Sequence, residues 1–374
     1  LNLLCCTIAT QVGNCAAIAR VRTPEYSQEA KYLRDKLGLA LIINPELEAA
    51  IEMAHILHLP SSLEVTNFAH GQAQLIKYEI PEGSILDGTK LMDLGTRHHA
   101  NILIGAVERD DEVTIPSGDF VLRKGDKLSF VGERRHTKEF FSHIGVNTHS
   151  VKNTLIIGGG KAAYYLAKQL ISRGIKVKII ENSFERCEEL SILLPGAVII
   201  NGDGTEQALL KEEGIETCQS FVPLTGIDEE NIMLTLYAKQ VSNAKVITKL
   251  NRITFTNVIN SLDLGSVISP KYITSEAIIA YVRAKKNSMN CNIETLYHMY
   301  DSRVEAIEFF VSENSNVTDI PLRDLKLKKH LLICFINRNG KIIIPTGNDS
   351  IQKNDTVMII TTHTGFTNLQ DIME

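Results

Sequence analysis

The sequence predicts an α/β fold, in which a Rossmann-like, doubly wound parallel sheet is followed by a small α+β lobe, with the pair duplicated in tandem. Three observations lead to this prediction. Apolar runs of strand length alternate with helix-period segments over residues 153–285, whereas strand-like runs separated by turns dominate after about residue 290. Segments near the start of the chain also recur later in the same order. Alternating strands and helices favour a parallel sheet with right-handed crossovers.

The repeat is anchored at four places. Each anchor pairs a segment of the first part with a similar one further along: Asn2–Asn14 with Asn231–Asn243, Leu37-Gly38 with Leu264-Gly265, Ile115–Gly118 with Ile344–Gly347, and Lys124–Asp126 with Lys353–Asp355. Four anchors in one order indicate a duplication. Residue 1 aligns with residue 230, so residues 152–229 have no counterpart in the first copy. We therefore expect the first copy to lack its N-terminal βαβ unit here.

The repeat sets the predicted domain boundaries. Residues 1–58 are a C-terminal remnant of the first Rossmann-like domain, 59–147 the first small α+β domain, 150–286 the second Rossmann-like domain and 287–374 the second small domain. In the complete copy the expected strands are 153–157, 176–181, 197–200, 220–224, 245–250, 267–268, 304–310, 331–337, 341–344 and 355–361. The expected helices are 161–173, 184–194, 205–213, 228–240, 275–285 and 364–374, with Asp228 as a helix N-cap.

Composition excludes several classes of function. Lys and Arg number 39 against 44 Asp and Glu, which argues against a nucleic-acid-binding surface. No apolar run approaches the ~20 residues that a membrane-spanning helix needs. None of the seven cysteines forms a C-x-x-C pair, so no zinc or redox motif is predicted. His55 and His58 are spaced for one helix face, but they have no evident third metal ligand, and His98-His99 reads as a solvated loop.

A glycine-rich segment carries the strongest functional signal. It follows a predicted strand, opens a predicted helix, and consists of Gly158, Gly159, Gly160, Lys161, Ala162 and Ala163. In a dinucleotide-binding turn the first glycine permits the tight turn and the second lets the backbone approach a pyrophosphate. Alanine is an accepted variant of the third glycine, and the helix N-terminus attracts phosphate. The alternative is a purely structural turn between a strand and a helix.

An acidic residue stands where a ribose acceptor is expected. Glu181 ends the second predicted strand of this copy, about 20 residues beyond Gly160. A carboxylate there accepts a hydrogen bond from a ribose hydroxyl and repels a 2′-phosphate. The sequence therefore predicts NAD(H), with an adenine nucleotide as the alternative ligand, rather than NADP.

Two further turns follow predicted strands at the edge of the sheet where such ligands bind. Asp203 and Gly204 lie after the third strand, and Asp203 can accept from an adenine amino group or merely shape the turn. Thr225 lies after the fourth strand, where it faces the far half of a dinucleotide or belongs to a simple helix cap. No catalytic residue is predicted, because no His, Lys and Asp cluster accompanies the binding lobe. Duplicated binding lobes without such a cluster favour a sensor.

These residues resemble a known family, the NAD-binding regulatory subunit of the bacterial Trk potassium-uptake system. The resemblance covers the whole chain and rests on Ile156–Gly160, Val177–Glu181, Glu185–Leu190, Gly202–Thr205, Asp228–Met233, Ile18–Tyr26 and Asn44–Glu46. It implies two tandem pairs of an N-terminal Rossmann and a C-terminal lobe that regulate potassium conductance. It also implies a homo-oligomer docked on the cytoplasmic face of the inner membrane against a membrane-embedded potassium transporter subunit.

The chain departs from the family pattern at Lys161–Ala163, where Asn-Ile-Gly is expected. The first glycine motif is also missing, so one nucleotide site per chain is predicted. Two alternatives stay open: an NAD-dependent oxidoreductase, and the ligand-gating lobe of a potassium channel or antiporter. The helix predicted at 275–285, with 44–59 as its first-copy counterpart, has an apolar face that requires a partner surface.

Overall fold

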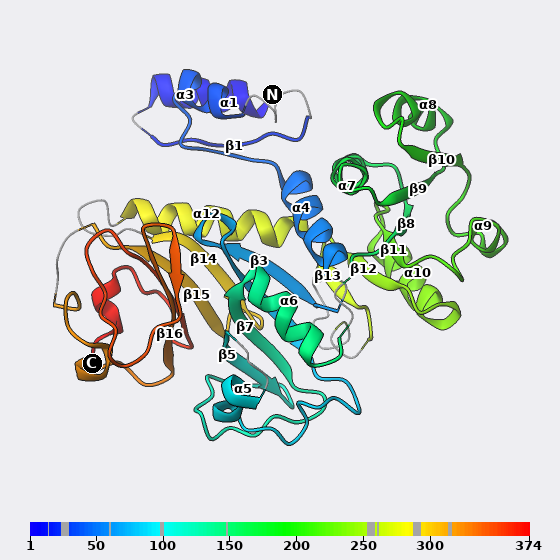
Figure 1. The fold of residues 1–374 in the computed structure, drawn as a ribbon. Helices are drawn as coiled ribbons and strands as arrows, with labels where there is room; N and C mark the ends of the chain where they lie inside the picture. Colours follow the sequence, from blue (N-terminus) through cyan, green and yellow to red (C-terminus); the bar gives the residue numbers. More distant parts are fainter. Residues whose placement is uncertain are drawn as a thin grey trace. The chain divides into compact units, whose positions relative to one another are not determined.

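The computed structural model describes residues 1–13, 15–23, 30–59, 61–97, 101–146, 149–252, 259, 262–286, 293–312 and 316–374. The chain forms two compact units (Figure 1). Unit 1 comprises Leu1–Pro60 and His149–Ser275, and unit 2 comprises Ser61–Thr148 and Glu276–Glu374. Each unit therefore combines segments from both copies of the repeat.

Unit 1 contains a six-stranded parallel sheet in the order β10-β9-β8-β11-β12-β13. Its strands are β8 (Asn153–Ile157), β9 (Lys176–Glu181), β10 (Ala197–Asn201), β11 (Ser220–Pro223), β12 (Lys245–Lys249) and β13 (Ser266–Ile268). This is the strand order of a dinucleotide-binding sheet, in which the direction of winding reverses between β8 and β11. The predicted Rossmann-like sheet is confirmed.

Helices connect these strands and close the core. They are α7 (Lys161–Ile171), α8 (Phe184–Leu193), α9 (Gln207–Glu212) and α10 (Asp228–Val241). The central strands are nearly continuous apolar runs because both faces of a parallel sheet are covered, and Leu155, Phe221 and Leu234 are buried together. The buried hydroxyls of Thr154 and Ser220 are 2.6 Å apart, so neither loses a hydrogen bond on burial.

The first copy contributes a shorter set of elements to unit 1. These are α1 (Asn2–Val12), β1 (Ile18–Arg20), α3 (Ala30–Leu37), β2 (Leu41–Ile43) and α4 (Pro45–His58). Strand β1 pairs with β2 in parallel, as β12 pairs with β13. Ile18 is opposite Leu41 and its repeat partner Ile247 is opposite Ser266, so in both copies this strand pairs in parallel with the strand that follows it.

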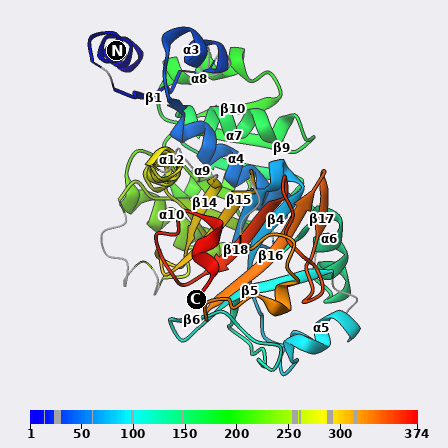
Figure 2. The same cartoon turned by 90° about the vertical axis from the view of Figure 1, so that its left-hand side faces the viewer.

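Helix α4 packs against α7 of the second copy (Figures 1 and 2). Asn44 accepts from the Leu47 amide at 3.1 Å and thereby caps α4. Its Nδ2 also donates to the Tyr165 hydroxyl at 2.9 Å, and that hydroxyl donates to the Arg22 carbonyl at 3.3 Å. The first copy is thus bonded directly to the helix that follows the glycine segment.

Unit 2 contains two antiparallel five-stranded sheets with equivalent orders, β3-β4-β7-β5-β6 and β14-β15-β18-β16-β17. The first is built from β3 (Glu64–Phe68), β4 (Ala73–Glu79), β5 (Ile102–Arg109), β6 (Glu112–Thr114) and β7 (Lys127–Glu133). The second is built from β14 (Ile293–Met299), β15 (Val304–Phe310), β16 (Leu331–Arg338), β17 (Lys341–Ile343) and β18 (Thr356–Thr361). Equivalent strand orders bear out the predicted duplication of the small lobe.

Short helices accompany these sheets. The first lobe carries α5 (Leu91–Arg97) and α6 (Arg134–His143), and 3₁₀ turns occupy Ala69–Gly71, Leu322–Asp324 and Leu369–Ile372. Helix α12 (Pro270–Lys286) joins the Rossmann-like sheet to the second lobe.

An equivalent arginine–aspartate ion pair stabilises a turn in each lobe. Arg109 contacts both carboxylate oxygens of Asp126 at 2.7 Å, and Arg338 contacts those of Asp355 at 2.9 and 2.8 Å. Each aspartate also accepts a backbone N–H, Asp355 from Gln352 at 2.7 Å. Asp126 and Asp355 are the last residues of the fourth repeat anchor, so this anchor coincides with a turn-stabilising ion pair in each copy.

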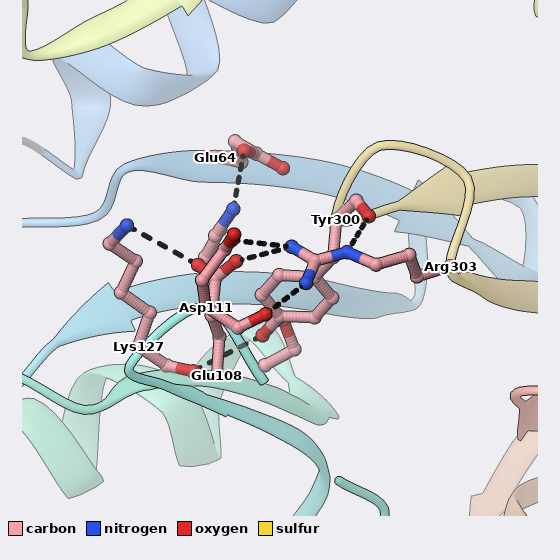
Figure 3. Close-up of polar contacts among 8 residues, drawn as sticks. Glu64, Glu108, Asp111, Lys127, Tyr300 and Arg303 are labelled. Atoms are coloured by element: carbon pink, nitrogen blue, oxygen red, sulfur yellow. Dashed lines mark hydrogen bonds and ion pairs between the residues drawn. The ribbon is translucent and has the colours of Figure 1, made fainter. Parts of the chain in front are cut away.

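The two lobes share a hydrophobic core and a polar seam within unit 2. Figure 3 shows Arg303 reaching the Glu108 carboxylate, at 2.7 Å, and the Asp111 carboxylate, at 3.3 Å. The Tyr300 hydroxyl lies 2.6 Å from Ser129 Oγ, and burial raises the pKa of Tyr300. Residues from both copies therefore meet around a neutral, buried phenol.

A buried charge cluster holds α12 to the second lobe. The Glu276 carboxylate lies 2.5 Å from His298 Nδ1, while Glu305 lies 3.2 Å from His298 Nε2 and pairs with Arg283 at 2.9 Å. The hydrogen bond to Glu276, followed by that to Glu305, raises the pKa of His298 to about 9. The imidazolium thus lies between two carboxylates near neutral pH, where its charge compensates theirs.

Several sequence predictions for individual elements are wrong. The predicted helix 364–374 is only a 3₁₀ turn at Leu369–Ile372, because Asn368 and Asp371 form a capping box around one short turn. Helix α12 begins at Pro270 rather than at residue 275, since proline is well tolerated in a first helical turn. Strand β14 was not predicted. The His98-His99 pair lies outside the described residues.

Two kinds of site are absent from the described parts of the chain. No helix there has both the length and the apolar composition that a membrane crossing requires. No group of three or more His, Cys, Asp or Glu side chains there is placed to hold a metal ion.

Candidate functional site

Gly158 makes the turn that leaves β8. Its φ of +94° lies in the left-handed region, which a residue with a side chain rarely adopts. A Cβ at this position would lie 3.1 Å from the Leu224 carbonyl oxygen, at the end of β11. The backbones of the turn after β8 and the turn after β11 are therefore in close contact. This contact lies where the sheet changes its direction of winding.

Gly159 is held from both sides. Its N–H donates to Glu181 Oε2 at 2.6 Å, and its carbonyl accepts from Arg186 Nε at 2.7 Å. A Cβ on Gly159 would lie 2.6 Å from Leu190 and 3.0 Å from the Glu181 carboxylate, so a side chain there fits only if these neighbours move. Packing therefore favours glycine at the middle position independently of any ligand.

Gly160 has different surroundings. It is the N-cap of α7 and makes no side-chain cap, and its φ of −65° and ψ of −175° are open to any residue. A Cβ built on it would meet no atom within 4 Å. The first N–H groups of a helix have no intrahelical acceptor and favour an anion. A cradle with free space and oriented amides is what a pyrophosphate requires.

The remaining residues of the glycine segment have separate positions. Lys161 is exposed at the first position of α7, whereas Ala162 and Ala163 are buried. Ala163 has no exposed surface, so the methyl group is accommodated where the family pattern leads us to expect glycine. The departure from that pattern is therefore compatible with close packing of the helix.

Glu181 ends β9 with its carboxylate directed at the glycine turn. One oxygen accepts from Gly159 N–H and the other from Ser183 N–H at 2.8 Å. An ionised carboxylate offers about four lone-pair sites, so acceptor capacity remains for a ribose hydroxyl. The acid is predicted by the sequence, whereas its second role, holding the glycine turn in place, is evident only in the structure.

Arg186 was not predicted as a site residue. It lies in the first turn of α8, where the Ser183 side chain accepts from its backbone N–H at 3.3 Å. The sequence contained one indication of this role. Arg186 follows the strand-end acid Glu181 closely, and some dinucleotide sites have a phosphate-binding arginine near that acid.

The turn after β10 is tightly built. Asp203 is exposed, and its Oδ1 accepts from the backbone N–H and hydroxyl of Thr205 at 2.8 and 2.7 Å, which lowers its pKa. A Cβ on Gly204 would lie 2.3 Å from the Ile157 side chain, so glycine lets this turn approach the end of β8. Asp203 shapes the turn in this structure, and its remaining lone pairs face solvent.

The turn after β11 is held by buried polar groups. Thr225 N–H donates to the fully buried Asn231 side chain at 2.9 Å, and Lys249 Nζ donates to the Thr225 carbonyl at 2.7 Å. Desolvation lowers the pKa of Lys249. The predicted N-cap role of Asp228 is wrong. Ile227 is the N-cap residue, and the Asp228 carboxylate instead accepts from Asn251 N–H at 2.8 Å across the sheet edge.

Family models match most of the described architecture. The TrkA-N domain model matches residues 154–270, which contain the six-stranded sheet and the glycine segment. The TrkA-C domain model matches twice, at residues 75–145 and 306–373, which lie in the two small lobes.

The chain is similar to proteins with assigned names. A Trk system potassium uptake protein TrkA homolog 1 of Methanosarcina mazei is 33% identical over 91% of this chain and 75% of its own length. The Trk system potassium uptake protein TrkA of Haemophilus influenzae is 27% identical, over 96% of this chain and 78% of its own length. Among solved structures, the GsuK channel bound to NAD is similar in fold, with a TM-score of 0.57 and 17% identity over 96% of this chain and 62% of that one.

Proposed function

The chain belongs to the TrkA family of potassium-uptake proteins, and from this we propose that it is a nucleotide-sensing regulatory subunit. It binds NAD(H) at residues 158–163 and controls potassium movement through a membrane-embedded transporter subunit. One observation carries the proposal: the N-terminus of α7 opens onto free space at Gly160, beside the Glu181 carboxylate, at the switch point of a dinucleotide-type sheet.

Different residues of the site contact different parts of the ligand. Gly160 and the amides of Lys161 and Ala162 hold the pyrophosphate, since their N–H groups point out of the helix end. Glu181 accepts from the adenosine ribose. Asp203 and Gly204 border the adenine, and Thr225 borders the far half of the dinucleotide. No residue there is assigned a catalytic role, and the alternative of an NAD-dependent oxidoreductase requires turnover of an NAD-linked substrate.

Helix α7 offers a route from the ligand to the first copy. Its first turn contacts the pyrophosphate, and Tyr165 one turn later is bonded to Asn44 and to the Arg22 carbonyl. A ligand that orders the glycine turn therefore acts on the segment that leads into the first small lobe. Such a ligand regulates a partner only if it binds one arrangement of the chain more tightly than another.

Titration of the purified chain with NADH is expected to give one site per chain. Within residues 1–374, the glycine turn with a strand-end acid occurs in the second copy. Isothermal calorimetry checks this, and a parallel titration with ADP tests the adenine-nucleotide alternative. A stoichiometry near two, or no heat with either ligand, contradicts the assignment.

Replacement of Glu181 by alanine is expected to weaken NADH binding about ten- to a hundredfold. The lost charged hydrogen bond contributes roughly 1.5–3 kcal/mol. Because Glu181 also holds the glycine turn, the ribose role needs a separate readout. We expect the parent to prefer ADP over 2′-deoxy-ADP and the variant to bind the two equally. A preference that survives in the variant shows that Glu181 does not contact the ribose.

The proposal includes a homo-oligomer that docks on the cytoplasmic face of the membrane, with α12 at the subunit interface. When α4 and α12 are aligned by the proline that begins each, their apolar positions differ in burial. In α4 these positions are fully buried: Met53, Ala54 and Leu57. Their α12 counterparts are partly exposed: Ile278, Ile279 at 37% and Val282 at 46%. The α12 face thus has the composition of a packing surface.

We expect Ile278→Asp to dissociate the oligomer, because an unpaired charge is costly to bury. Lys271→Asp on the same helix is the control and should leave the mass unchanged, since Lys271 is exposed. Analytical ultracentrifugation measures the mass, and NADH titration confirms that the nucleotide site is intact. A folded, NADH-binding Ile278→Asp chain of parental mass contradicts the interface.

A further inference from the structure

Two charged side chains contact Gly159 in the glycine turn, and a third contacts one of these two. Glu181 accepts from Gly159 N–H, and Arg186 donates to its carbonyl. Arg186 Nη1 also pairs with Glu189 Oε2 at 2.5 Å, three residues further along α8. The side chains of Arg186 and Glu189 are 24% and 58% exposed. The arginine is thus anchored by Nε to the turn and by Nη1 to a carboxylate near the surface.

These charges favour opposite ligands. An acid at the end of the second strand favours an unmodified ribose, whereas an arginine nearby accommodates a 2′-phosphate. This protein has both the acid, Glu181, and the arginine, Arg186, and each of them is hydrogen-bonded to the Gly159 backbone. The net charge of the three side chains Glu181, Arg186 and Glu189 is one negative charge. This net charge becomes zero if Glu189 is neutralised. The discrimination against a 2′-phosphate therefore depends on the Arg186–Glu189 pair as well as on Glu181.

We propose that Glu189 is a specificity-determining residue, which holds and neutralises the Arg186 guanidinium and so makes the site reject a 2′-phosphorylated dinucleotide. This inference rests on the proposed function, because it concerns the ligand of the same site. Glu189 itself touches no ligand and acts through Arg186. Nη1 of Arg186, once released, is a charged donor of the kind that binds phosphate.

The test compares NADH and NADPH binding to the full chain. In Glu189→Gln the ratio of the dissociation constants, Kd for NADPH over Kd for NADH, is expected to fall roughly five- to tenfold at low salt. The Kd for NADH itself is expected to stay within about twofold of the parent value, because the ribose acceptor is unchanged. The shift should shrink as ionic strength rises, since the pair is partly exposed.

Two variants complete the test. Glu188→Gln removes the neighbouring exposed charge and is expected to leave the ratio at the parent value. Arg186→Gln combined with Glu189→Gln is expected to cancel the gain in NADPH binding, because the released cation is then absent. A ratio that does not move in Glu189→Gln, that moves equally in Glu188→Gln, or that stays shifted in the double variant overturns the inference. A parent chain that binds neither ligand overturns the proposed function as well.

Discussion

Replacement of Gly160 by alanine is expected to weaken NADH binding at least a hundredfold while leaving the fold intact. The φ of −65° suits alanine, and the added methyl group meets no atom within 4 Å. At a compatible position, Gly→Ala raises the free energy of unfolding by about 0.4–1 kcal/mol. The same methyl group occupies the space into which the pyrophosphate must come, so it excludes the ligand and little else.

Gly158→Ala is the matched control. Gly158 has a φ of +94°, and its Cβ would lie 3.1 Å from a backbone oxygen, so alanine there is strained whether or not a ligand is present. We expect Gly158→Ala to lower the midpoint of thermal unfolding and Gly160→Ala to leave it unchanged or slightly raised. Fluorescence titration with NADH completes the comparison. Parental affinity in Gly160→Ala would place the pyrophosphate elsewhere.

Replacement of Asp355 by alanine is expected to lower the free energy of unfolding of unit 2 by about 3 kcal/mol. Asp355 is 1% exposed, and its loss removes the acceptor of the Gln352 N–H and the ionic partner of Arg338, which keeps only its hydrogen bond to the Ser350 carbonyl among these contacts. Arg338 is 30% exposed, so water replaces part of the interaction, which places the effect at the low end of the range for a broken buried pair.

The duplication supplies an internal check on this prediction. Asp126→Ala breaks the equivalent pair in the other lobe and is expected to cost a similar amount. Asp324→Ala removes a surface aspartate that pairs with Arg323 at 3.8 Å and is expected to cost less than about 1 kcal/mol. Urea unfolding of the three variants measures the differences. Equal losses of unfolding free energy in Asp324→Ala and Asp355→Ala would contradict a stabilising role for the buried ion pair.

The second Rossmann-like sheet was predictable because its strands are short apolar or alternating runs bounded by turn residues. The predicted ends of β8 and β9 coincide with the observed ones, Ile157 and Glu181. Strand β14 was missed because its residues, Ile293–Met299, mix polar and apolar side chains without a regular period. Its burial depends on strands of the other lobe and on the shared core, which no local pattern reveals.

The candidate site was predictable in its backbone but not in its side-chain contacts. Spacing indicated Gly158, Gly160 and Glu181, because a turn and a helix start leave a signal in sequence. The clamp of Glu181 and Arg186 on Gly159 joins residues from three elements and depends on the packed fold. The same reason explains why the repeat anchor at Asp126 gave no indication of its partner Arg109, which is the last residue of β5.

The function proposed for this chain is control of potassium movement through a membrane partner by a nucleotide bound at residues 158–163. Potassium flux through proteoliposomes that contain the partner transporter, with the full chain added outside, tests it most directly. With the parent chain, NADH is expected to change the flux, and with Gly160→Ala, which retains the fold, NADH is expected to have no effect. A nucleotide response of equal size with both chains, or none with the parent chain, would contradict regulation through this site.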